Sequence, residues 1–555
     1  MNKSKLKVKS QKDSLPYSLL ATRYSLMLLL FSSCAQILSP TGGPKDTTPP
    51  KVVRYTPDSA ALHFKAKQIR ILFNEFVQLK NISNQLIISP PLKHPSDVKV
   101  KGKELIINIT DTLEPNTTYD FNFGEAIADI TESNVLKNFQ YVFSTGSFID
   151  SLSLKGNVKD ALTLSPQKDV LVMLYSTSDD SLPLKKLPNY FAKTAENGSF
   201  KINNIRSGQY KVFALKDANA NYKYDSPDEN IGFLDSLLDI TTNRSADLLL
   251  FKESPKKQFI RKAKAIEFGH LQFVFNKPVT ALYLKPLNYV PKDSVWEIEE
   301  FNKTNDTLDL WLPNYEKDTL KLIVSDDKRT LDTLEFAIPP KNSKEKKFKF
   351  NYKTNAGGLL DMNREVSVQF NHYLADNLIP VDSVRIKEDS TRYTKNDIDI
   401  LQSGRVVKIA KRKSGYWKEN TRYKMLIPPG TVTDVFGLKN DSIKIEFRTR
   451  ELKNYGTLKI NIDLPSDLFG SLFQLLTTKD EVVVERPIID SKPFTLEYLM
   501  PQEYKMRLVI DKNKNRKFDT GNYLKHQQPE KVIYYPGKIT IRSNWDLEQD
   551  WKIRE

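Results

Sequence analysis

The chain has 555 residues, with 84 Lys and Arg against 68 Asp and Glu, which gives a formal net charge of +16. This length exceeds what one hydrophobic core supports, so several domains are expected. Charges of both signs are interleaved, which is typical of solvated strand faces. Because the first residues also indicate export, nucleic acid is excluded as an expected partner.

The first 50 residues have the pattern of an export and anchoring segment. A basic stretch ends at Arg23, and a short apolar run from Tyr24 to Phe31 leads to Cys34, the single cysteine. The run is too short to span a bilayer permanently. It resembles a bacterial lipoprotein signal, so residues 1–33 are predicted to be a signal peptide and Cys34 the lipidated residue. The alternative is an ordinary signal peptide with a chance cysteine. Residues 34–50, rich in Gly and Pro, are predicted to be a flexible tether.

From residue 51 onward the pattern predicts strand after strand. Tyr119, Phe121 and Phe123 alternate with polar residues, and turn residues separate such runs at intervals of about eight to twelve positions. The expected fold class is therefore all-β, with β-sandwiches in tandem after the signal peptide.

One internal repeat pairs the segments 116–119 and 420–423, which read Asn-Thr-Thr-Tyr and Asn-Thr-Arg-Tyr. Each precedes a closing strand, at 143–145 and 447–449. These residues resemble SbsA-type bacterial Ig-like domains, which occur in envelope lipoproteins of Bacteroidota. The resemblance implies Ig-like domains at 51–147 and 351–450, with a degenerate relative at 260–345.

A second repeat aligns Phe200 through Asp217 with Phe494 through Asp511 without a gap. This segment resembles prealbumin-like modules of the carboxypeptidase-regulatory type. The resemblance implies accessory, non-catalytic β-sandwiches at 150–256 and 455–555.

Both copies of the second repeat end in loops rich in Asp and Asn. Short oxygen-bearing side chains at alternate positions of a tight loop are ligands that calcium accepts, so Ca²⁺ is a candidate cofactor. The alternative is an Asx-rich turn without an ion. The candidate ligands are Asp217, Asn219, Asn221, Asp225 and Asp228 in the first loop, and Asp511, Asn513, Asn515 and Asp519 in the second.

The triplet Asp, Ser or Thr, then an aliphatic residue or Thr recurs along the whole chain. It resembles the O-glycosylation sequon of Bacteroidota, in which the hydroxyl accepts the glycan. The alternative is that the triplet suits a turn leading into a strand. Candidate acceptors are Thr47, Ser59, Thr112 and Thr307.

Catalytic patterns find little support in the sequence. No two of the five histidines lie at metal-ligand spacing, and no phosphate loop or nucleophile elbow is present. The acidic pair Asp326–Asp327 is expected to be solvated in a polar turn. Tryptophans could stack on sugars where exposed, although in sandwiches they more often belong to the core. We therefore expect no enzymatic activity.

The expected function is that of a cell-envelope lipoprotein acting as a structural or interaction scaffold. It would attach to the membrane through its lipid anchor and serve an envelope protein partner, such as an outer-membrane complex, or a polysaccharide. The resemblance implies the outer membrane, and residues 35–38 lack the acidic cluster of surface-exported relatives, which favours the periplasmic face. The alternatives are a carbohydrate-binding adhesin and a hydrolase with an unrecognised site.

Overall fold

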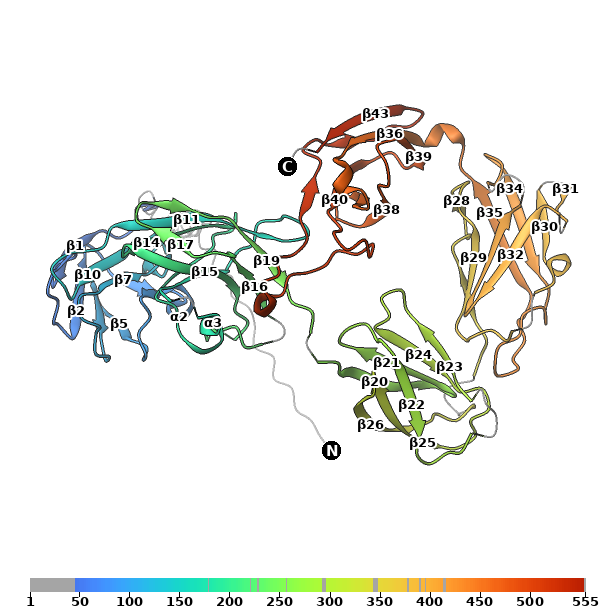
Figure 1. Cartoon of the computed structure of the whole chain (residues 1–555), viewed down its shortest axis with the longest axis horizontal. Helices are drawn as coiled ribbons and strands as arrows, with labels where there is room; N and C mark the ends of the chain where they lie inside the picture. The colour runs from blue at the N-terminus through green and yellow to red at the C-terminus, as the bar shows by residue number, and fades with distance from the viewer. Residues whose placement is uncertain are drawn as a thin grey trace, which may run out of the picture.

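The computed structural model shows β-sandwiches connected in tandem (Figure 1). It describes residues 45–553 except 178, 220, 227–228, 256, 292–295, 343–347, 377–378, 389–390, 395 and 413–415. The all-β prediction is confirmed, because the helices within these residues are single turns. None of the described helices has the length and apolar character needed to cross a membrane.

Module 1 comprises the strands β1 to β10. They are β1 (Val52–Thr56), β2 (Gln68–Phe73), β3 (Val77–Leu79), β4 (Ile87–Ser89), β5 (Asp97–Lys101), β6 (Glu104–Asn108), β7 (Thr118–Asn122), β8 (Ile127–Asp129), β9 (Val135–Leu136) and β10 (Gln140–Ser144), with the short helix α2 (Ile82–Gln85). The sheets β1-β2-β6-β5 and β10-β7-β4 enclose one apolar core, and β3-β8-β9 forms a third, smaller sheet.

Modules 3 and 4 repeat the pairing order of module 1. Module 3 contains β20 (Ile260–Glu267), β21 (His270–Phe275), β22 (Leu282–Pro286), β23 (Ile298–Phe301), β24 (Thr307–Trp311), β25 (Thr319–Asp326) and β26 (Arg329–Ala337). Module 4 contains β27 (Tyr352–Thr354), β28 (Leu359–Leu360), β29 (Val366–Phe370), η1 (Val381–Ser383), β30 (Arg385–Glu388), β31 (Thr391–Arg392), β32 (Ile398–Ser403), β33 (Val406–Lys411), β34 (Arg422–Ile427) and β35 (Ile443–Thr449). Their first sheets run β20-β21-β24-β23 and β27-β29-β33-β32, as β1-β2-β6-β5 does in module 1.

Modules 2 and 5 share a different plan. Module 2 contains β11 (Leu152–Asp160), β12 (Leu171–Tyr175), α3 (Leu182–Lys185), β13 (Tyr190–Lys193), β14 (Ser199–Ile205), β15 (Gly208–Lys216), β16 (Asn230–Phe233), β17 (Leu238–Ile240), β18 (Arg244–Ser245) and β19 (Leu248–Lys252). Module 5, after η2 (Leu452–Asn454), contains β36 (Gly456–Asp463), η3 (Ser466–Leu468), β37 (Leu472–Thr477), β38 (Val482–Pro487), β39 (Phe494–Leu499), β40 (Glu503–Val509), η4 (Tyr523–Lys525), β41 (Val532–Tyr534), β42 (Ile539–Thr540) and β43 (Asp546–Lys552).

In each of these two modules the first strand pairs antiparallel with the fourth and parallel with the last. β11 pairs in this way with β14 and β19, and β36 with β39 and β43. The second strand pairs with the fifth, as β12 with β15 and β37 with β40. The ungapped sequence repeat therefore corresponds to a repeated strand plan.

The repeated Asn-Thr-x-Tyr segment has the same structural role in modules 1 and 4. Asn116 and Asn420 adopt left-handed φ angles of 51° and 49°, which asparagine tolerates well. The Tyr119 hydroxyl then accepts a hydrogen bond from the Glu114 N–H at 2.8 Å, and the Tyr423 hydroxyl accepts one from the Lys418 N–H at 3.0 Å. In each module, a hydrogen bond thus connects the turn that precedes a central strand to the buried tyrosine on that strand.

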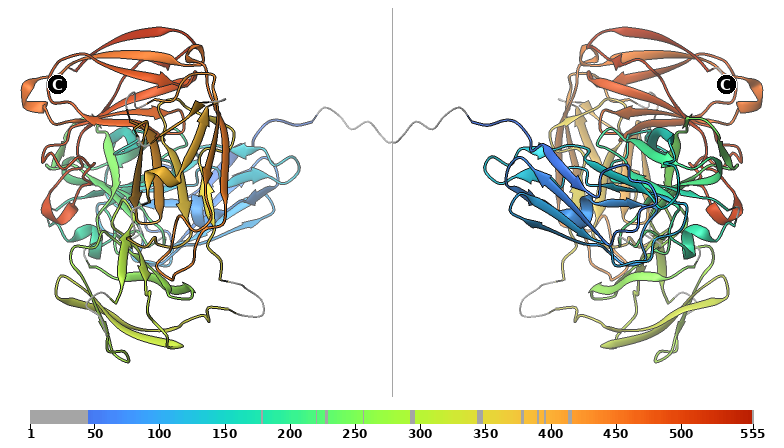
Figure 2. Two further views of the ribbon diagram at one scale, coloured as in Figure 1. Left: turned by 90° about the vertical axis from the view of Figure 1, so that its right-hand side faces the viewer. Right: turned by 90° about the vertical axis from the view of Figure 1, so that its left-hand side faces the viewer.

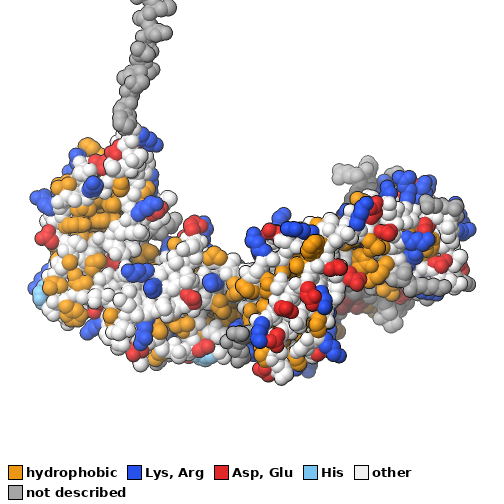
Figure 3. Space-filling view, turned by 90° about the horizontal axis from the view of Figure 1, so that it is seen from above, with side chains coloured by type: hydrophobic (Ala, Val, Ile, Leu, Met, Phe, Trp, Pro, Cys, Tyr) orange, Lys and Arg blue, Asp and Glu red, His pale blue; other side chains and the backbone are white. Residues whose placement is uncertain are grey.

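The chain turns back on itself. Figures 1 and 2 show modules 1 and 2 side by side, module 3 and module 4 following, and module 5 returning to module 2. The view in Figure 3 shows charges of both signs scattered over an elongated surface, with apolar side chains in small groups between them.

The junction between modules 3 and 4 buries a histidine between two carboxylates. The His372 Nδ1 lies 2.5 Å from Asp434 Oδ2 within module 4, and its Nε2 lies 3.3 Å from Glu267 Oε1 of module 3. Burial opposes the charged imidazolium, but the two carboxylates outweigh it, so the pKa of His372 lies above its ordinary value of 6.5. A charged network of this kind favours one arrangement of the two modules.

A second contact at this junction involves Arg405. Its guanidinium, from module 4, lies 2.8 Å from carboxylate oxygens of both Glu300 and Asp309 in module 3. It also lies 5.4 Å from the ring of Trp311, and the imidazole of His270 stacks on that ring with 3.8 Å between the ring centres. The planar guanidinium can serve both carboxylates and the indole at once, which an ammonium group cannot.

The two tryptophans Trp417 and Trp545 give a matched test of the module 4 core. Trp417 is buried against Tyr423 and Phe447 and donates to the Arg364 carbonyl at 2.9 Å, whereas Trp545 is 57% exposed. Trp417→Ala is expected to lower the free energy of unfolding of module 4 by about 3–5 kcal/mol. Trp545→Ala should change the stability of module 5 by less than about 0.5 kcal/mol. Hydrogen exchange resolved by module measures both, and equal effects would contradict the assigned burial.

The His372 network predicts a pH-dependent junction. Because the pKa of His372 is raised in the folded state, its stabilisation is fully present below about pH 6.5 and is lost as pH rises through the folded pKa. His372→Gln should therefore abolish this pH dependence and destabilise the junction by about 3 kcal/mol at acidic pH. Hydrogen exchange in modules 3 and 4 between pH 6 and 9 tests this, with the exposed-site variant His63→Asn as control. A wild-type junction that is equally protected at both ends of the range would refute the assignment.

Candidate functional site

The predicted lipidation residue, Cys34, lies outside the described residues. The described chain starts at Lys45, and Asp46 is held close to module 1 because its carbonyl accepts a hydrogen bond from Asn134 Nδ2 at 2.9 Å. The side chain of Asp46 accepts from the N–H and hydroxyl of Thr48 at 2.8 and 2.6 Å. Position 46 is therefore where the chain joins the first sandwich.

The predicted glycan acceptors differ in accessibility. Thr47 and Thr112 are exposed, while Ser59 and Thr307 are partly buried. The Thr307 hydroxyl also donates to its neighbour Asp306 at 3.2 Å. Access for a glycosylating enzyme thus favours Thr47 and Thr112.

The first Asx loop is organised by hydrogen bonds onto its two carboxylates. Asp217 accepts from the backbone N–H of Tyr222 at 2.8 Å, and Asp225 accepts from the side-chain amides of Asn219 and Asn221 at 3.1 and 2.7 Å. The amide nitrogens rather than oxygens face Asp225, so a bound cation would require both amides to turn. Asp228 lies outside the described residues.

The second Asx loop repeats this geometry. Asp511 accepts from the Arg516 N–H at 2.6 Å, and Asp519 accepts from the amides of Asn513 and Asn515 at 2.5 and 2.9 Å. Within the described parts of the chain, no group of three or more His, Cys, Asp or Glu side chains is placed to hold a metal ion. A cation in either loop would therefore depend on asparagine and backbone oxygens.

A buried glutamate completes each loop and was missed from the sequence. Glu229 accepts from the backbone N–H groups of Ala218, Asp225 and Ser226 at 3.1–3.2 Å. Glu530 accepts in the same way from Lys512 and Asp519, both at 3.0 Å. The two glutamates were hard to match because Glu229 follows Asp225 by four positions and Glu530 follows Asp519 by eleven.

The extra residues of the second loop form a projecting segment, residues 520–529, which we call the finger. It carries Tyr523 into module 2, where the ring is almost fully buried at 5.2 Å from the rings of Phe213 and Phe233. The Tyr523 hydroxyl donates to the Asp180 carbonyl at 2.6 Å, and its N–H donates to Glu253. Module 5 thus contributes a side chain to a core cluster of module 2.

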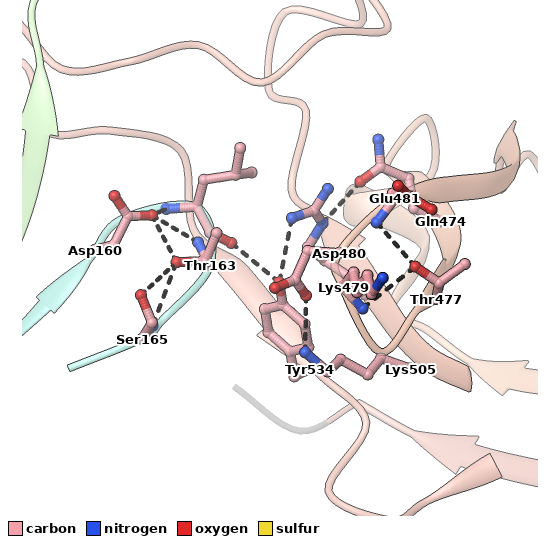
Figure 4. Close-up of polar contacts among 12 residues, drawn as sticks. Asp160, Thr163, Ser165, Gln474, Thr477, Lys479, Asp480, Glu481, Lys505 and Tyr534 are labelled. Carbon is pink, nitrogen blue, oxygen red and sulfur yellow. Dashed lines mark hydrogen bonds and ion pairs between the residues drawn. The ribbon is translucent and has the colours of Figure 1, made fainter. Parts of the chain in front are cut away.

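A second contact joins modules 2 and 5 beside the finger (Figure 4). The Tyr534 hydroxyl accepts from Arg507 Nη1 at 3.1 Å and reaches the Leu162 carbonyl at 3.5 Å. The buried Arg507 is itself fixed by Gln474 Oε1 at 2.7 Å. The loop of module 2 that carries Leu162 is in turn closed by Asp160, which accepts from Leu162 and Thr163. Both sides of this contact are therefore preorganised.

A buried acid lies at the junction of modules 1 and 2. Asp120 faces a small cavity shared with Phe191 and Lys201 of module 2, and its Oδ1 has no hydrogen-bond partner within the described structure. Burial raises the pKa of Asp120 to about 7. Burial at this junction therefore makes the carboxyl of Asp120 titrate near neutral pH.

The acidic pair Asp326–Asp327 corrects one expectation. Asp327 is exposed, but Asp326 is buried and accepts hydrogen bonds from the N–H groups of Thr280 and Ala281 at 3.0 and 2.7 Å. The prediction that both are solvated was wrong for Asp326, because the turn at residue 280 folds over it.

Histidine–carboxylate pairs are present but do not form a catalytic arrangement among the described residues. His372–Asp434 is fully buried, and His270–Asp309 is enclosed by the module 3–4 junction. The exposed His94 lies 2.5 Å from Asp111 in a pocket that Ser96 also lines. The Ser96 hydroxyl, however, forms no hydrogen bond to His94 or to any other described residue. A nucleophile activated by its base would need that contact.

No curated protein matches the chain. Among solved structures it is similar to BcpA, the major pilin subunit of Bacillus cereus, at 8% identity over 73% of this chain and 99% of that chain, with a TM-score of 0.13. The Bacillus anthracis TIE protein is 11% identical over 92% and 76% of the two chains, with a TM-score of 0.14. Domains 1–6 of the surface layer protein SbsC are 11% identical over 83% and 65%, with a TM-score of 0.13. Scores this low carry no argument about function.

The comparison that bears on the fold is with a protein family. Residues 46–145 match the family described as Bacterial Ig-like domain, and this range covers the strands of module 1. The Ig-like domain expected near the N-terminus is confirmed. Module 1 therefore matches a bacterial Ig-like domain, and it is one module of a multidomain all-β chain.

Proposed function

We propose that the chain is a non-enzymatic scaffold of the bacterial cell envelope, anchored through Cys34 to the periplasmic face of the outer membrane. The observation that carries this proposal is the finger, which seats Tyr523 in module 2 and so fixes the last module on the second. A chain that fixes its sandwiches relative to one another presents its edges and loops at set positions. That is the property required of an accessory subunit in a larger envelope complex.

Buried junction chemistry supports the same proposal. The module 3–4 contact uses His372 and Arg405 of module 4 with three carboxylates of module 3. The module 4–5 contact uses Tyr455, whose hydroxyl donates to Asp361 Oδ1 at 2.9 Å. Polar networks of this kind specify one arrangement more than they add stability. The sandwiches therefore act as parts of one frame.

Two finer assignments accompany the scaffold proposal. The exposed Thr47 and Thr112 are proposed as glycan acceptors, because both follow an Asp and are accessible. The two Asx loops are proposed as weak calcium sites. Their layout around Asp217 and Asp511 is the same in both modules, and the second loop adjoins the finger.

Recovery of the chain from native membranes tests the scaffold proposal. Affinity purification followed by mass spectrometry is expected to enrich at least one envelope protein, and Cys34→Ser is expected to release the chain from the membrane fraction. Ser33→Ala serves as the matched control and should leave membrane attachment intact. The intact mass should exceed that of the polypeptide by the lipid and any glycans. Recovery of the chain alone, at polypeptide mass, would refute the proposal.

Calcium titration tests the Asx loops. If millimolar calcium exceeds the dissociation constant tenfold, each occupied loop gains about 1.4 kcal/mol, which corresponds to a rise in melting temperature of about 2–4 °C for its module. Asp225→Asn and Asp519→Asn should each remove the rise in their own module. The exposed-site variant Asp239→Asn should not. Identical melting curves in calcium and in chelator would leave the loops as ion-free Asx turns.

A further inference from the structure

A groove of about 480 Å³ runs along one edge of module 3. Its wall and floor are formed by Leu282, Leu284, Tyr289, Trp296, Glu297 and Glu299. Two exposed apolar side chains also line it, Tyr283 at 62% and Val290 at 85% exposed. An exposed apolar group around a groove marks an interaction site more often than an isolated exposed residue does.

The strand that borders the groove has a free backbone edge. β22 pairs with β25 and, among the described strands, with no other. The Leu287 N–H donates to the Lys321 carbonyl at 2.9 Å, and the Asp327 N–H donates to the Ala281 carbonyl at 3.1 Å. In an antiparallel pair this register directs the odd-numbered residues of β22 toward β25. The N–H and C=O groups of Leu282 and Leu284 therefore face away from the sheet, toward the open edge.

The corresponding edge is covered in module 4, which has the same strand plan. There β30 occupies the place of β22, and β31 pairs with it through Lys387 and Glu388. Glu388 is also satisfied locally by Lys418 at 2.5 Å and by Tyr393. Within the described part of module 3, no strand takes the place of β31. The same sandwich plan thus has this edge closed in module 4 and open in module 3.

The groove also carries two glutamates, Glu297 and Glu299, for which the salt bridges of the described residues provide no partner. The Glu297 Oε2 is buried and has no hydrogen-bond partner. Burial and the nearby Glu299 raise the pKa of Glu297 to about 7, so a cation placed beside the two glutamates would favour their charged forms. Lys285 lines the groove but forms no ion pair with any described residue. A buried carboxylate oxygen without a partner is unfavourable unless a cation or hydrogen-bond donor reaches it.

We infer that the groove of module 3 binds an extended segment of a protein partner, which adds to β22 as an extra strand and places a Lys or Arg beside Glu297 and Glu299. Backbone groups of Leu282 and Leu284 would supply the hydrogen bonds of the added strand, and the apolar floor would take its alternate side chains. This inference rests on the proposed scaffold function, for which it names the partner's chemistry. A free backbone edge favours a polypeptide over a glycan, because only a polypeptide continues the hydrogen-bond pattern of a sheet.

Fluorescence polarisation with a labelled seven-residue peptide of alternating Lys and Val tests the inference on the purified chain. Saturable binding is expected. The same peptide with N-methylated amides along one edge keeps its charge but cannot donate those hydrogen bonds, so its affinity should fall at least tenfold. The affinity of a peptide with Glu in place of Lys should be lower by a similar factor.

Protein variants measure the contribution of the two glutamates to binding separately from that of the strand edge. The double variant Glu297→Gln with Glu299→Gln should bind the Lys–Val peptide at least fivefold more weakly than the unchanged chain. The matched control is Glu316→Gln with Glu335→Gln, two exposed sites in the same module that should leave binding unchanged. Equal binding of the N-methylated peptide, or equal affinity in the groove variant and its control, would overturn the inference. Competition by a neutral oligosaccharide would overturn it in favour of a glycan site.

The outcome is distinguishable from failure of the scaffold proposal. If envelope proteins are enriched from native membranes but the peptide does not bind, the groove assignment fails and the scaffold function stands. If the peptide binds but no envelope protein is enriched, the scaffold function fails on its own evidence.

Discussion

The ring of Tyr523 lies in the core of a module more than 250 residues earlier in the chain, and the arrangement of the whole molecule depends on that insertion. Without it, modules 2 and 5 would be held together only by smaller contacts such as that between Tyr534 and Leu162. With it, the last module is attached to the second through a buried aromatic ring and hydrogen bonds from Tyr523 and Thr520. An aromatic side chain suits this role because it buries a large apolar area while its hydroxyl still finds an acceptor.

The finger also shows how a repeated module acquires a new role. Modules 2 and 5 have the same strand plan and the same Asx loop, and both loops are closed by a glutamate that accepts backbone N–H groups. In module 5 the segment between Asp519 and Glu530 is longer, and it is this segment that carries Tyr523 into the core of module 2. The core of module 5 is thereby left unchanged, because the insertion begins and ends at a loop that was already fixed.

Much of the architecture was predictable from local patterns. Alternation around Tyr119 indicated strands, and the ungapped alignment of Phe200–Asp217 with Phe494–Asp511 indicated two modules of one plan. These patterns act within a strand or a turn. The burial of Asp326, the insertion of Tyr523 and the open edge of β22 were not predictable, because each is decided by a segment distant in sequence. The Asp-rich loops could be recognised from their residue pattern, but the closing Glu229 and Glu530 were hidden by unequal spacing.

The closed path of the chain has a mechanical consequence. Module 3 is connected to module 2 directly along the chain, and also through modules 4 and 5 and the finger. A force applied between module 1 and module 3 is therefore shared by these two connections in parallel, and is not carried by a single linker. The hydrogen bonds of Tyr523 and the charged contacts of Arg405 lie on the second connection, so they would carry part of the load and limit how far the frame can extend.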